Sequence, residues 1–548
     1  MAENFTTEEE KVLSRFVTNT NSDIFALINL PQVVAGALFS RYSRSTKSLR
    51  RVLLDEFIND KETGFADIVA YSDKQGEKQI IATRKAEEFY ERVLVGFGDD
   101  SVAELGGAHI ACENISNVAT KFLQDARIGI SPLEKSTRYV YFNEKNEKGE
   151  YRYCREPKIM QSEFAKEYLN ACNLLFETYC SLMEPVKKYV MEKNPQEDGV
   201  SERAYSATIR AKTCDILRCL LPASTLTNTG MYGNGRAFEY LIMKGYASEL
   251  GEMREIAGKM QGELSKVIPS FVKRANDKYG ALNQEYLKGR ERKVGEEACR
   301  IAEEIGIGTV KTQSEPVVLV EYDENALEKV VCTILFPHLH CPLKEIKEKV
   351  KGMGREAKIA LIDAYVGERK NRRHKPGRAF ENVEYTFCIC GNFGMYRDLH
   401  RHRILTQERQ LLTTEHGFEM PKELVEINAG DNVHKAVLAA DVLYKKMQKK
   451  IPREAQYVVP MGCKMQWYIK MNLREAVHFC ELRSMAQGHR DYRKIAQEIY
   501  LRIKEVHPYF AEHMNFVDMK GEYSLERLES EKRIDKRMDK MQKAGRSD

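Results

Sequence analysis

An internal repeat is the feature of this 548-residue sequence that most restricts how it can fold. Arg218–Pro222 (RCLLP) resembles Gln456–Pro460 (QYVVP), and an Asn-x-Arg motif begins twelve residues after each proline. Val267–Phe271 (VIPSF) and Val506–Phe510 (VHPYF) then match in the same order. Matches that keep one order and a matched spacing indicate a duplicated domain.

The repeat predicts how the chain is divided. We expect a first copy over residues 26–275 and a second over 316–525, joined by a charged segment, 276–315, that is typical of a connecting helix and linker. Residues 526–548 are rich in charged side chains and poor in apolar ones, so we expect a charged tail. The chain is longer than one ordinary domain, which agrees with this division.

Charge and cysteine content exclude several classes of protein. The 86 Lys and Arg residues nearly balance the 81 Asp and Glu residues, so a dedicated nucleic-acid-binding protein is not expected. The 13 cysteines form no CxxC pair, and His400-x-His402 has no supporting ligands nearby, so we expect reduced thiols and no metal site. The sequence shows neither an apolar signal segment nor a run of 18 apolar residues, so we expect a cytoplasmic protein without a membrane anchor.

A row of basic residues, Arg401-His402-Arg403, stands out in the second copy. Guanidinium groups bind phosphate oxygens in pairs, so this row could hold a phosphate or a pyrophosphate. Such a row is also typical of a solvated helix face or of a nonspecific polyanion patch. The row gains weight only from its counterpart in the first copy.

The two copies retain different residues at this place. When Ser131 is aligned with Thr406, Ser136-Thr137-Arg138 of the first copy stands opposite Leu411-Leu412-Thr413 of the second. The first copy lacks the Arg-His-Arg row and keeps Ser-x-Arg, whereas the second copy does the reverse. The pattern predicts that the copies have divided the residues of one site between them.

Two further basic positions follow the repeat. Arg218 precedes the first proline, and Gln456 takes its place in the second copy. Counting back 25 residues from Pro269 and from Pro508 gives Lys244 and Arg483, so a basic residue stands there in both copies.

These motifs, in this order, resemble those of the flavin-dependent thymidylate synthases. The family signature contains Arg-His-Arg-x-x-Ser, Ser-x-Arg-Tyr, Arg-x-x-Leu-Pro and Asn-x-Arg with a later Arg, and here it is split between two fused copies that together span most of the chain. The resemblance implies an α+β fold in two tandem copies, each a mixed sheet with packed long helices. The family is homotetrameric with sites shared between subunits, so a homodimer of this chain would form a pseudo-tetramer.

The resemblance also implies a reaction and a set of site residues. Family members methylate deoxyuridine monophosphate with FAD as cofactor and with methylenetetrahydrofolate and NADPH as co-substrates. Carried over by position, the flavin contacts are Arg401, His402, Arg403, Asn472, Arg474, His478 and Ser101. The nucleotide contacts are Glu134, Ser136, Thr137, Arg138, Arg218, Arg401 and, more weakly, Lys244. The catalytic positions are Ser136 and Arg483, with Arg483 in the place of the arginine that favours ionised uracil N3.

The motif residues that each copy lacks leave two alternatives open. Leu411 removes a hydroxyl from the second copy, and the first copy has no complete basic row. A flavin- or nucleotide-binding homologue without catalysis, or an enzyme for a different pyrimidine nucleotide, has the same motifs.

Overall fold

The computed structural model describes residues 5–43, 45–59, 103–307 and 310–544, which fall into two compact units. Unit 1 draws on Met1–Lys135, Glu156–Lys158 and Thr227–Gly308, and unit 2 on Ser136–Arg155, Ile159–Leu226 and Thr309–Asp548. The units therefore do not follow chain order, because two stretches of the first predicted copy pack within unit 2.

Unit 1 contains a three-stranded sheet with the strand order β1-β3-β2, in which β2 and β3 are antiparallel. The strands are β1 (Gly107–Ser116), β2 (Ile130–Glu134) and β3 (Leu226–Asn234). The helices of this part are α1 (Thr7–Leu13), α2 (Gln32–Tyr42), α3 (Leu49–Val52), α7 (Asn117–Asp125), α11 (Gly235–Ala247), α12 (Gly251–Leu264), α13 (Pro269–Val272) and α14 (Lys278–Glu304).

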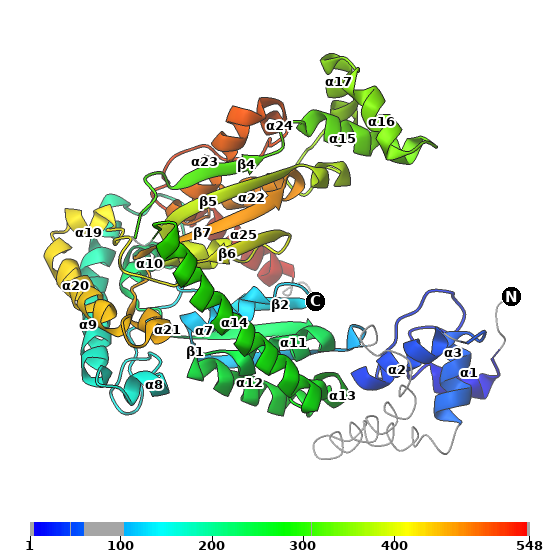
Figure 1. Ribbon diagram of the computed structural model, residues 1–548, viewed down its shortest axis with the longest axis horizontal. Helices are drawn as coiled ribbons and strands as arrows, with labels where there is room; N and C mark the ends of the chain where they lie inside the picture. Colours follow the sequence, from blue (N-terminus) through cyan, green and yellow to red (C-terminus); the bar gives the residue numbers. More distant parts are fainter. Residues whose placement is uncertain (1–4, 44, 60–102, 308–309, 545–548) are drawn as a thin grey trace. The chain divides into compact units, whose positions relative to one another are not determined.

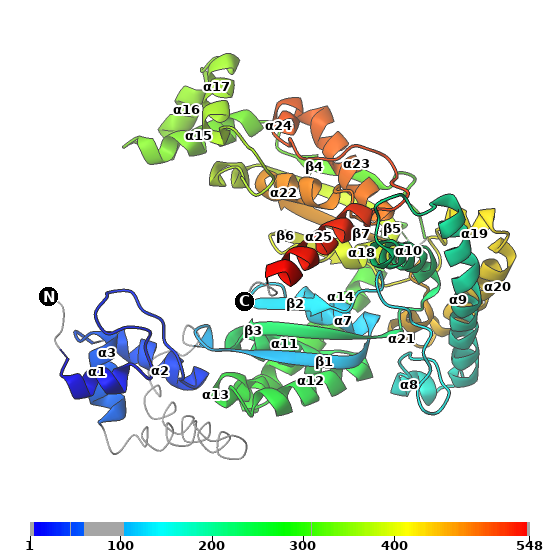
Figure 2. The same cartoon turned by 180° about the vertical axis from the view of Figure 1, so that it is seen from behind.

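Unit 2 contains an antiparallel sheet with the strand order β4-β5-β7-β6, and α22 and α23 pack against it (Figures 1 and 2). The strands are β4 (Val317–Tyr322), β5 (Glu384–Asn392), β6 (Leu405–Arg409) and β7 (Lys464–Asn472). The helices are α9 (Ala165–Lys193), α10 (Glu202–Leu217), α15 (Ala326–Leu335), α16 (Leu343–Lys351), α17 (Arg355–Val366), α18 (Phe393–Leu399), α19 (Lys422–Glu426), α20 (Gly430–Met447), α21 (Pro452–Ala455), α22 (Leu473–Arg483), α23 (Arg490–Val506), α24 (Pro508–Glu512) and α25 (Leu528–Ala544). The short α8 (Pro157–Met160) lies where the chain passes from one unit to the other.

The asparagine of each Asn-x-Arg motif begins a helix. Asn234 accepts a hydrogen bond from the backbone N–H of Ala237 at 2.8 Å and caps α11, while Asn472 accepts one from Glu475 at 2.9 Å and caps α22. Asparagine is favoured at this position because its side chain satisfies a free N–H of the first helical turn. The motif therefore marks the same strand-to-helix junction in both repeats.

Strand register supports the alignment of the repeats. Ile130 of β2 lies opposite Gly233, one residue before the capping asparagine of the first repeat. Leu405 of β6 lies opposite Met471, one residue before the capping asparagine of the second. The next residues, Ser131 and Thr406, are therefore structural counterparts, as the sequence alignment predicts.

The two proline segments pair with each other inside unit 2, and we call this pairing the proline seam. Pro222 lies opposite Pro460 in an antiparallel bridge. Ala223 N–H donates to the Val459 carbonyl at 2.8 Å, and the equivalent Met461 N–H donates to the Leu221 carbonyl at 2.9 Å. A contact in which equivalent residues exchange the same bonds is the signature of a two-fold axis.

A second pair of hydrogen bonds extends the same symmetry. Ser224 N–H donates to the Tyr457 carbonyl at 3.0 Å, and Gly462 N–H donates to the Cys219 carbonyl at 2.8 Å. The long helices α9 and α20 pack side by side (Figures 1 and 2). Unit 2 therefore has the contacts of a pseudo-dimer interface within one chain.

The charged ends of the two repeats are helical. The segment that we expected to connect the copies forms α14, and the charged tail forms α25. Helix α25 packs against α10, where Arg203 lies 3.0 Å from Glu531. Just before α25 begins, Glu526 lies 2.8 Å from Lys212 of α10.

Substituting Gly462 with alanine tests the proline seam. A Cβ atom at Gly462 meets the Phe418 ring at 2.4 Å and the Cys219 Cβ at 2.9 Å, so the seam must shift. We expect Gly462→Ala to lower the free energy of unfolding by about 1–3 kcal/mol, as overpacking does. Thermal unfolding measures the effect, and Gly430→Ala, where a Cβ meets no atom within 4 Å, is the control. Equal midpoints for the two variants contradict the prediction.

Candidate functional site

A buried carboxylate, Asp398, gathers arginines from both repeats in unit 2. Arg218 of the first repeat donates from Nη1 to Asp398 Oδ2 at 3.2 Å, and Arg401 Nη2 of the second lies 3.7 Å from Oδ1. Burial of Asp398 opposes its ionisation, but Arg218, Arg401, Arg138 and Arg483 outweigh burial and lower its pKa to about 2. The carboxylate is therefore charged at neutral pH and holds these cations together.

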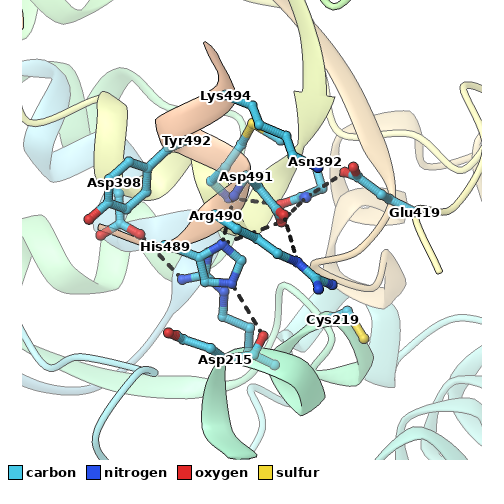
Figure 3. Close-up of polar contacts among 12 residues, drawn as sticks. Asp215, Cys219, Asn392, Asp398, Glu419, His489, Arg490, Asp491, Tyr492 and Lys494 are labelled. Atoms are coloured by element: carbon cyan, nitrogen blue, oxygen red, sulfur yellow. Dashed lines mark hydrogen bonds and ion pairs between the residues drawn. The ribbon is translucent and has the colours of Figure 1, made fainter. Parts of the chain in front are cut away.

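Arg138 is locked by partners from two helices. Its Nε and Nη2 donate to Asp215 of α10 at 2.8 and 2.7 Å, and its Nη1 donates to the Tyr492 hydroxyl of α23 at 3.2 Å. The side chain is buried, so bidentate pairing with Asp215 offsets the cost of removing its charge from water. Figure 3 shows Asp215, Tyr492 and Asp398 in this part of the site.

Arg218 differs from Arg138 because one of its donors is unused. The residue is only 4% exposed, and its Nη2 has no hydrogen-bond partner among the described residues. A buried donor without a partner costs free energy, so an anion that accepts from it stabilises the site. Arg218 lines a cleft of about 170 Å³. The cleft's charged lining consists of Asp215, Arg218, Glu419, Lys422, Arg490, Asp491, Lys494 and Glu522, several of which are drawn in Figure 3.

Gln456, the counterpart of Arg218 in the second repeat, uses both ends of its side-chain amide in hydrogen bonds. Gln456 accepts from the Leu412 N–H at 3.1 Å and donates to the Arg453 carbonyl at 3.0 Å. Both ends of its amide therefore bond to the backbone, and the second repeat uses this position for structure.

The central histidine of the Arg-His-Arg row is buried, whereas Arg401 and Arg403 are exposed. His402 Nδ1 lies 2.5 Å from Glu475 Oε1, and Arg483 donates from Nε to His402 Nε2 at 2.8 Å. A guanidinium can only donate, so Nε2 must accept and Nδ1 must carry the proton toward Glu475. The three side chains form a hydrogen-bonded chain, which we call the Glu475–His402–Arg483 relay.

Burial sets the protonation of the relay. Burial, with the nearby charges of Arg483 and Lys375, lowers the pKa of His402 well below its usual value, so the imidazole is neutral. Burial also raises the pKa of Glu475 to about 7, although neighbouring cations oppose this shift. His478, one helical turn after Glu475, has its pKa lowered to about 4 by burial. The relay therefore carries one group, Glu475, that titrates near neutral pH.

Ser136 and Thr137 lie in unit 2 beside this cluster. The Ser136 hydroxyl accepts a hydrogen bond from the Arg138 N–H at 3.2 Å, and Thr137 Oγ1 accepts one from Arg397 Nη1 at 3.0 Å. Unit 2 therefore brings together residues of the first repeat, Ser136, Thr137, Arg138 and Arg218, with Arg401, His402 and Arg483 of the second. Arg403 follows His402 in the chain and is exposed.

The second-repeat residues assigned to flavin have mixed surroundings. Asn472 is occupied as the cap of α22, and Arg474 donates to the Pro376 carbonyl at 2.8 Å and to Glu381 at 3.1 Å. His478 is half-buried, with its ring centroid 5.6 Å from that of His402.

Three sequence-predicted positions are not in this cluster as described. Glu134 belongs to unit 1, where it is buried and lies 2.9 Å from Lys121 Nζ. Lys244 also belongs to unit 1, with its Nζ 4.7 Å from the centroid of the Tyr240 ring. Ser101 lies outside the described residues.

Sequence reasoning missed the acidic and aromatic partners of the site. Asp215 lies in the last turn of α10, and Tyr492 lies in the first turn of α23, where neither has a motif around it. Glu475 follows the capping Asn472 by three residues, a position that is typical of a simple helix start. Only the fold shows that these side chains reach the arginines.

The charges of the site favour an anionic ligand. Four guanidinium groups, from Arg138, Arg218, Arg401 and Arg483, lie near two carboxylates, Asp215 and Asp398, so these six side chains have a net charge of +2. This charge matches a dianionic phosphate monoester. Within the described ranges, no group of three His, Cys, Asp or Glu residues is arranged to hold a metal ion, and the thirteen cysteines are free. No helix in the same ranges has the length and apolar character needed to span a bilayer.

Known proteins are similar to this chain over more than nine-tenths of its length. The family described as thymidylate synthase complementing protein matches residues 52–270 and 319–509. A UPF0159 protein of Chlamydia pneumoniae is 43% identical over 540 residues, covering 97% of this chain and 98% of the relative. A UPF0159 protein of Thermoplasma acidophilum is 32% identical over 524 residues, covering 91% of this chain and 98% of the relative. The two matched segments agree with the duplication.

Substituting Glu475 with glutamine tests the relay through its pH dependence. The pKa of Glu475 is raised from 4.5 to about 7, so the folded state favours the neutral form and loses stability as pH rises through this window. Glutamine keeps an acceptor for His402 without the charge. We expect the free energy of unfolding of Glu475→Gln, relative to that of the wild type, to rise by about 2–3 kcal/mol between pH 4.5 and pH 8.

Thermal unfolding across this pH range, with Glu408→Gln on exposed strand β6 as the control, measures the difference. A difference between Glu475→Gln and wild type that does not change with pH contradicts the shifted carboxylate.

Proposed function

The chain belongs to the family of thymidylate synthase complementing proteins, and we propose that it methylates deoxyuridine monophosphate to thymidylate. The proposed cofactor is FAD, and the proposed co-substrates are methylenetetrahydrofolate and NADPH. The soluble co-substrates fit a cytoplasmic enzyme.

The observation that carries this proposal is the meeting of first-repeat and second-repeat arginines around Asp398 in unit 2. Arg218 offers a buried Nη2 donor, and the net charge of the cluster suits the phosphate of the nucleotide. Arg138, which Asp215 and Tyr492 hold in one orientation, supplies a preorganised positive charge. These features support binding of a nucleoside monophosphate by Ser136, Thr137, Arg138 and Arg218.

Exposed donors beside the cluster fit the cofactor. Arg401 and Arg403 are exposed on either side of the buried His402, so their guanidinium groups are available to the pyrophosphate of FAD. When bound, FAD supplies the electron transfer and carries the one-carbon unit, as the family resemblance implies. Asn472 and Arg474 are engaged with the protein, and we propose that they shape the flavin pocket together with His478.

Arg483 is proposed to activate the pyrimidine. Carbon 5 of uracil is a weak nucleophile until negative charge develops on the ring, and a fixed cation near N3 and O4 stabilises that charge. The relay fixes Arg483 through its Nε, which leaves the two Nη groups for the ring. We propose that Ser136 supplies a catalytic hydroxyl in the same site as Arg483.

We propose one competent site per chain. The reciprocal combination would need Leu411 to act as the serine, Thr413 as the arginine and Gln456 as the phosphate-binding arginine. Leu411 has no hydroxyl, neither Thr413 nor Gln456 carries a guanidinium group, and the amide of Gln456 is already bonded to the backbone. A homodimer of the chain, built as a pseudo-tetramer, then holds two sites.

The decisive experiment is release of tritium from C5-labelled deoxyuridine monophosphate. Release that requires FAD, methylenetetrahydrofolate and NADPH together supports the proposed reaction. Flavin absorbance and a melting shift with nucleotide, but no tritium release, identify a binding protein without this catalysis. Absence of flavin binding rejects the proposal.

Substituting Arg218 with glutamine gives the first repeat the residue that the second repeat has at the equivalent position, Gln456. We expect Arg218→Gln to weaken binding of deoxyuridine monophosphate by about 2–4 kcal/mol, because a buried charge-assisted donor is lost. Isothermal titration or a melting shift measures the affinity. Arg210→Gln, on an exposed position of the preceding helix α10, is the matched control. Unchanged affinity in Arg218→Gln contradicts the assignment of the phosphate to this residue.

A further inference from the structure

Tyr492, in the first turn of α23, contacts an arginine from each repeat. Arg138 of the first repeat donates from Nη1 to the Tyr492 hydroxyl at 3.2 Å. The guanidinium carbons of Arg138 and of Arg483, which comes from the second repeat, each lie 5.8 Å from the centre of the tyrosine ring. A cation at this distance is attracted by an aromatic ring. All three residues belong to unit 2, and Tyr492 is buried there.

The hydroxyl of Tyr492 keeps one hydrogen-bonding function in reserve. A guanidinium group can only donate, so the phenol oxygen accepts from Arg138. The same hydroxyl carries a proton, and among the described residues no acceptor takes it. A buried tyrosine O–H usually finds an acceptor. The O–H of Tyr492 is therefore suited to a ligand oxygen beside the two arginines.

The surroundings hold the ring of Tyr492 in place. A Cβ atom at Gly488 would lie 2.7 Å from Tyr492 Cε2, so the ring fits only because this residue is a glycine. His489 caps α23, and its Nε2 lies 3.3 Å from the carbonyl oxygen of Asp215. The carboxylate of Asp215 binds Arg138, so the same two helices fix both the tyrosine and its arginine. The hydroxyl is positioned before a ligand arrives.

The first repeat has no hydroxyl at the equivalent position. Helices α12 and α23 each begin 18 residues before the proline of their repeat, Pro269 or Pro508. The third residue of α12 is Met253, which is buried, whereas the third residue of α23 is Tyr492. The helix start therefore does not require a hydroxyl here. The tyrosine occurs in the repeat that also has Arg483, where the first repeat has Lys244.

The position of Tyr492 identifies the group that its hydroxyl would meet. Under the proposed function, on which this step rests, the nucleotide contacts Arg138 and places N3 and O4 of its ring beside Arg483. We infer that the Tyr492 hydroxyl donates a hydrogen bond to the carbonyl oxygen at position 4 of the pyrimidine and so selects uracil over cytosine. Cytosine has an amino group at position 4, which donates and cannot accept from the hydroxyl.

The same hydrogen bond would assist activation of the ring. Negative charge that develops on the pyrimidine is shared by the oxygen at position 4, and a fixed donor stabilises it there. The proton stays on the phenol oxygen throughout, so Tyr492 needs no other group to take or return it. This contact adds a neutral donor to the cation that Arg483 supplies.

Substituting Tyr492 with phenylalanine tests the contact through base preference. The variant keeps the ring and removes the hydroxyl. We expect wild-type full-length protein to prefer deoxyuridine monophosphate over deoxycytidine monophosphate, and Tyr492→Phe to lower this preference about tenfold, the effect of one hydrogen bond. Isothermal titration with each nucleotide measures it. Tyr500→Phe, on the same helix and without a side-chain hydrogen bond among the described residues, is the control.

The ratio of the two affinities separates a base contact from a structural role. Loss of support for Arg138 would weaken both nucleotides equally, so an unchanged ratio in Tyr492→Phe overturns the inference. Gly488→Ala displaces the ring without removing the hydroxyl and should lower the ratio in the same direction. Wild-type protein that binds both nucleotides equally overturns the inference alone, whereas wild-type protein that binds neither overturns the proposed function as well.

Discussion

The proline seam is the contact on which the rest of unit 2 depends. Backbone hydrogen bonds between equivalent residues place Pro222 opposite Pro460 and give the two repeats a local two-fold relation. Arg218 and Gln456 each begin the 3-10 turn that leads into the seam. Symmetry therefore provides two equivalent positions at this turn, and the sequence places an arginine in one and a glutamine in the other. Because backbone groups make the seam, the side chains beside it can diverge without loss of the pairing.

The arginine cluster is possible only because buried carboxylates compensate it. Four guanidinium groups gathered near one buried carboxylate repel one another, and Asp398 and Asp215 reduce that repulsion. The nearby guanidinium groups lower the pKa of Asp398, whereas burial alone would raise it. The carboxylates also fix the directions of Arg138 and Arg218 before any ligand binds. Preorganised charge of this kind requires no rearrangement when an anion arrives.

Much of the repeat could be predicted from sequence because it rests on short motifs with local physical causes. The Asn-x-Arg motif marks a helix start in both repeats, and the strand register agrees with aligning Ser131 and Thr406. Arg218 and Arg483 were predicted from the repeat and the family resemblance, and both lie among the charges around Asp398. Asp215 and Glu475 could not be found this way, because their role comes from partners distant in the sequence. Nor could composition show that residues 159–226 pack with the second repeat, since that follows from three-dimensional contacts.

Fusion of the two repeats explains how their turns came to differ. In a symmetric dimer a substitution changes both equivalent positions, but in a fused chain each position changes alone. Gln456 satisfies its own amide with the Leu412 N–H and the Arg453 carbonyl, so its turn is complete without a ligand. Arg218 keeps a buried donor that has no partner among the described residues, so an anion that accepted from this donor would complete its turn. A ligand that satisfied Arg218 would add its binding free energy to the stability of the folded unit.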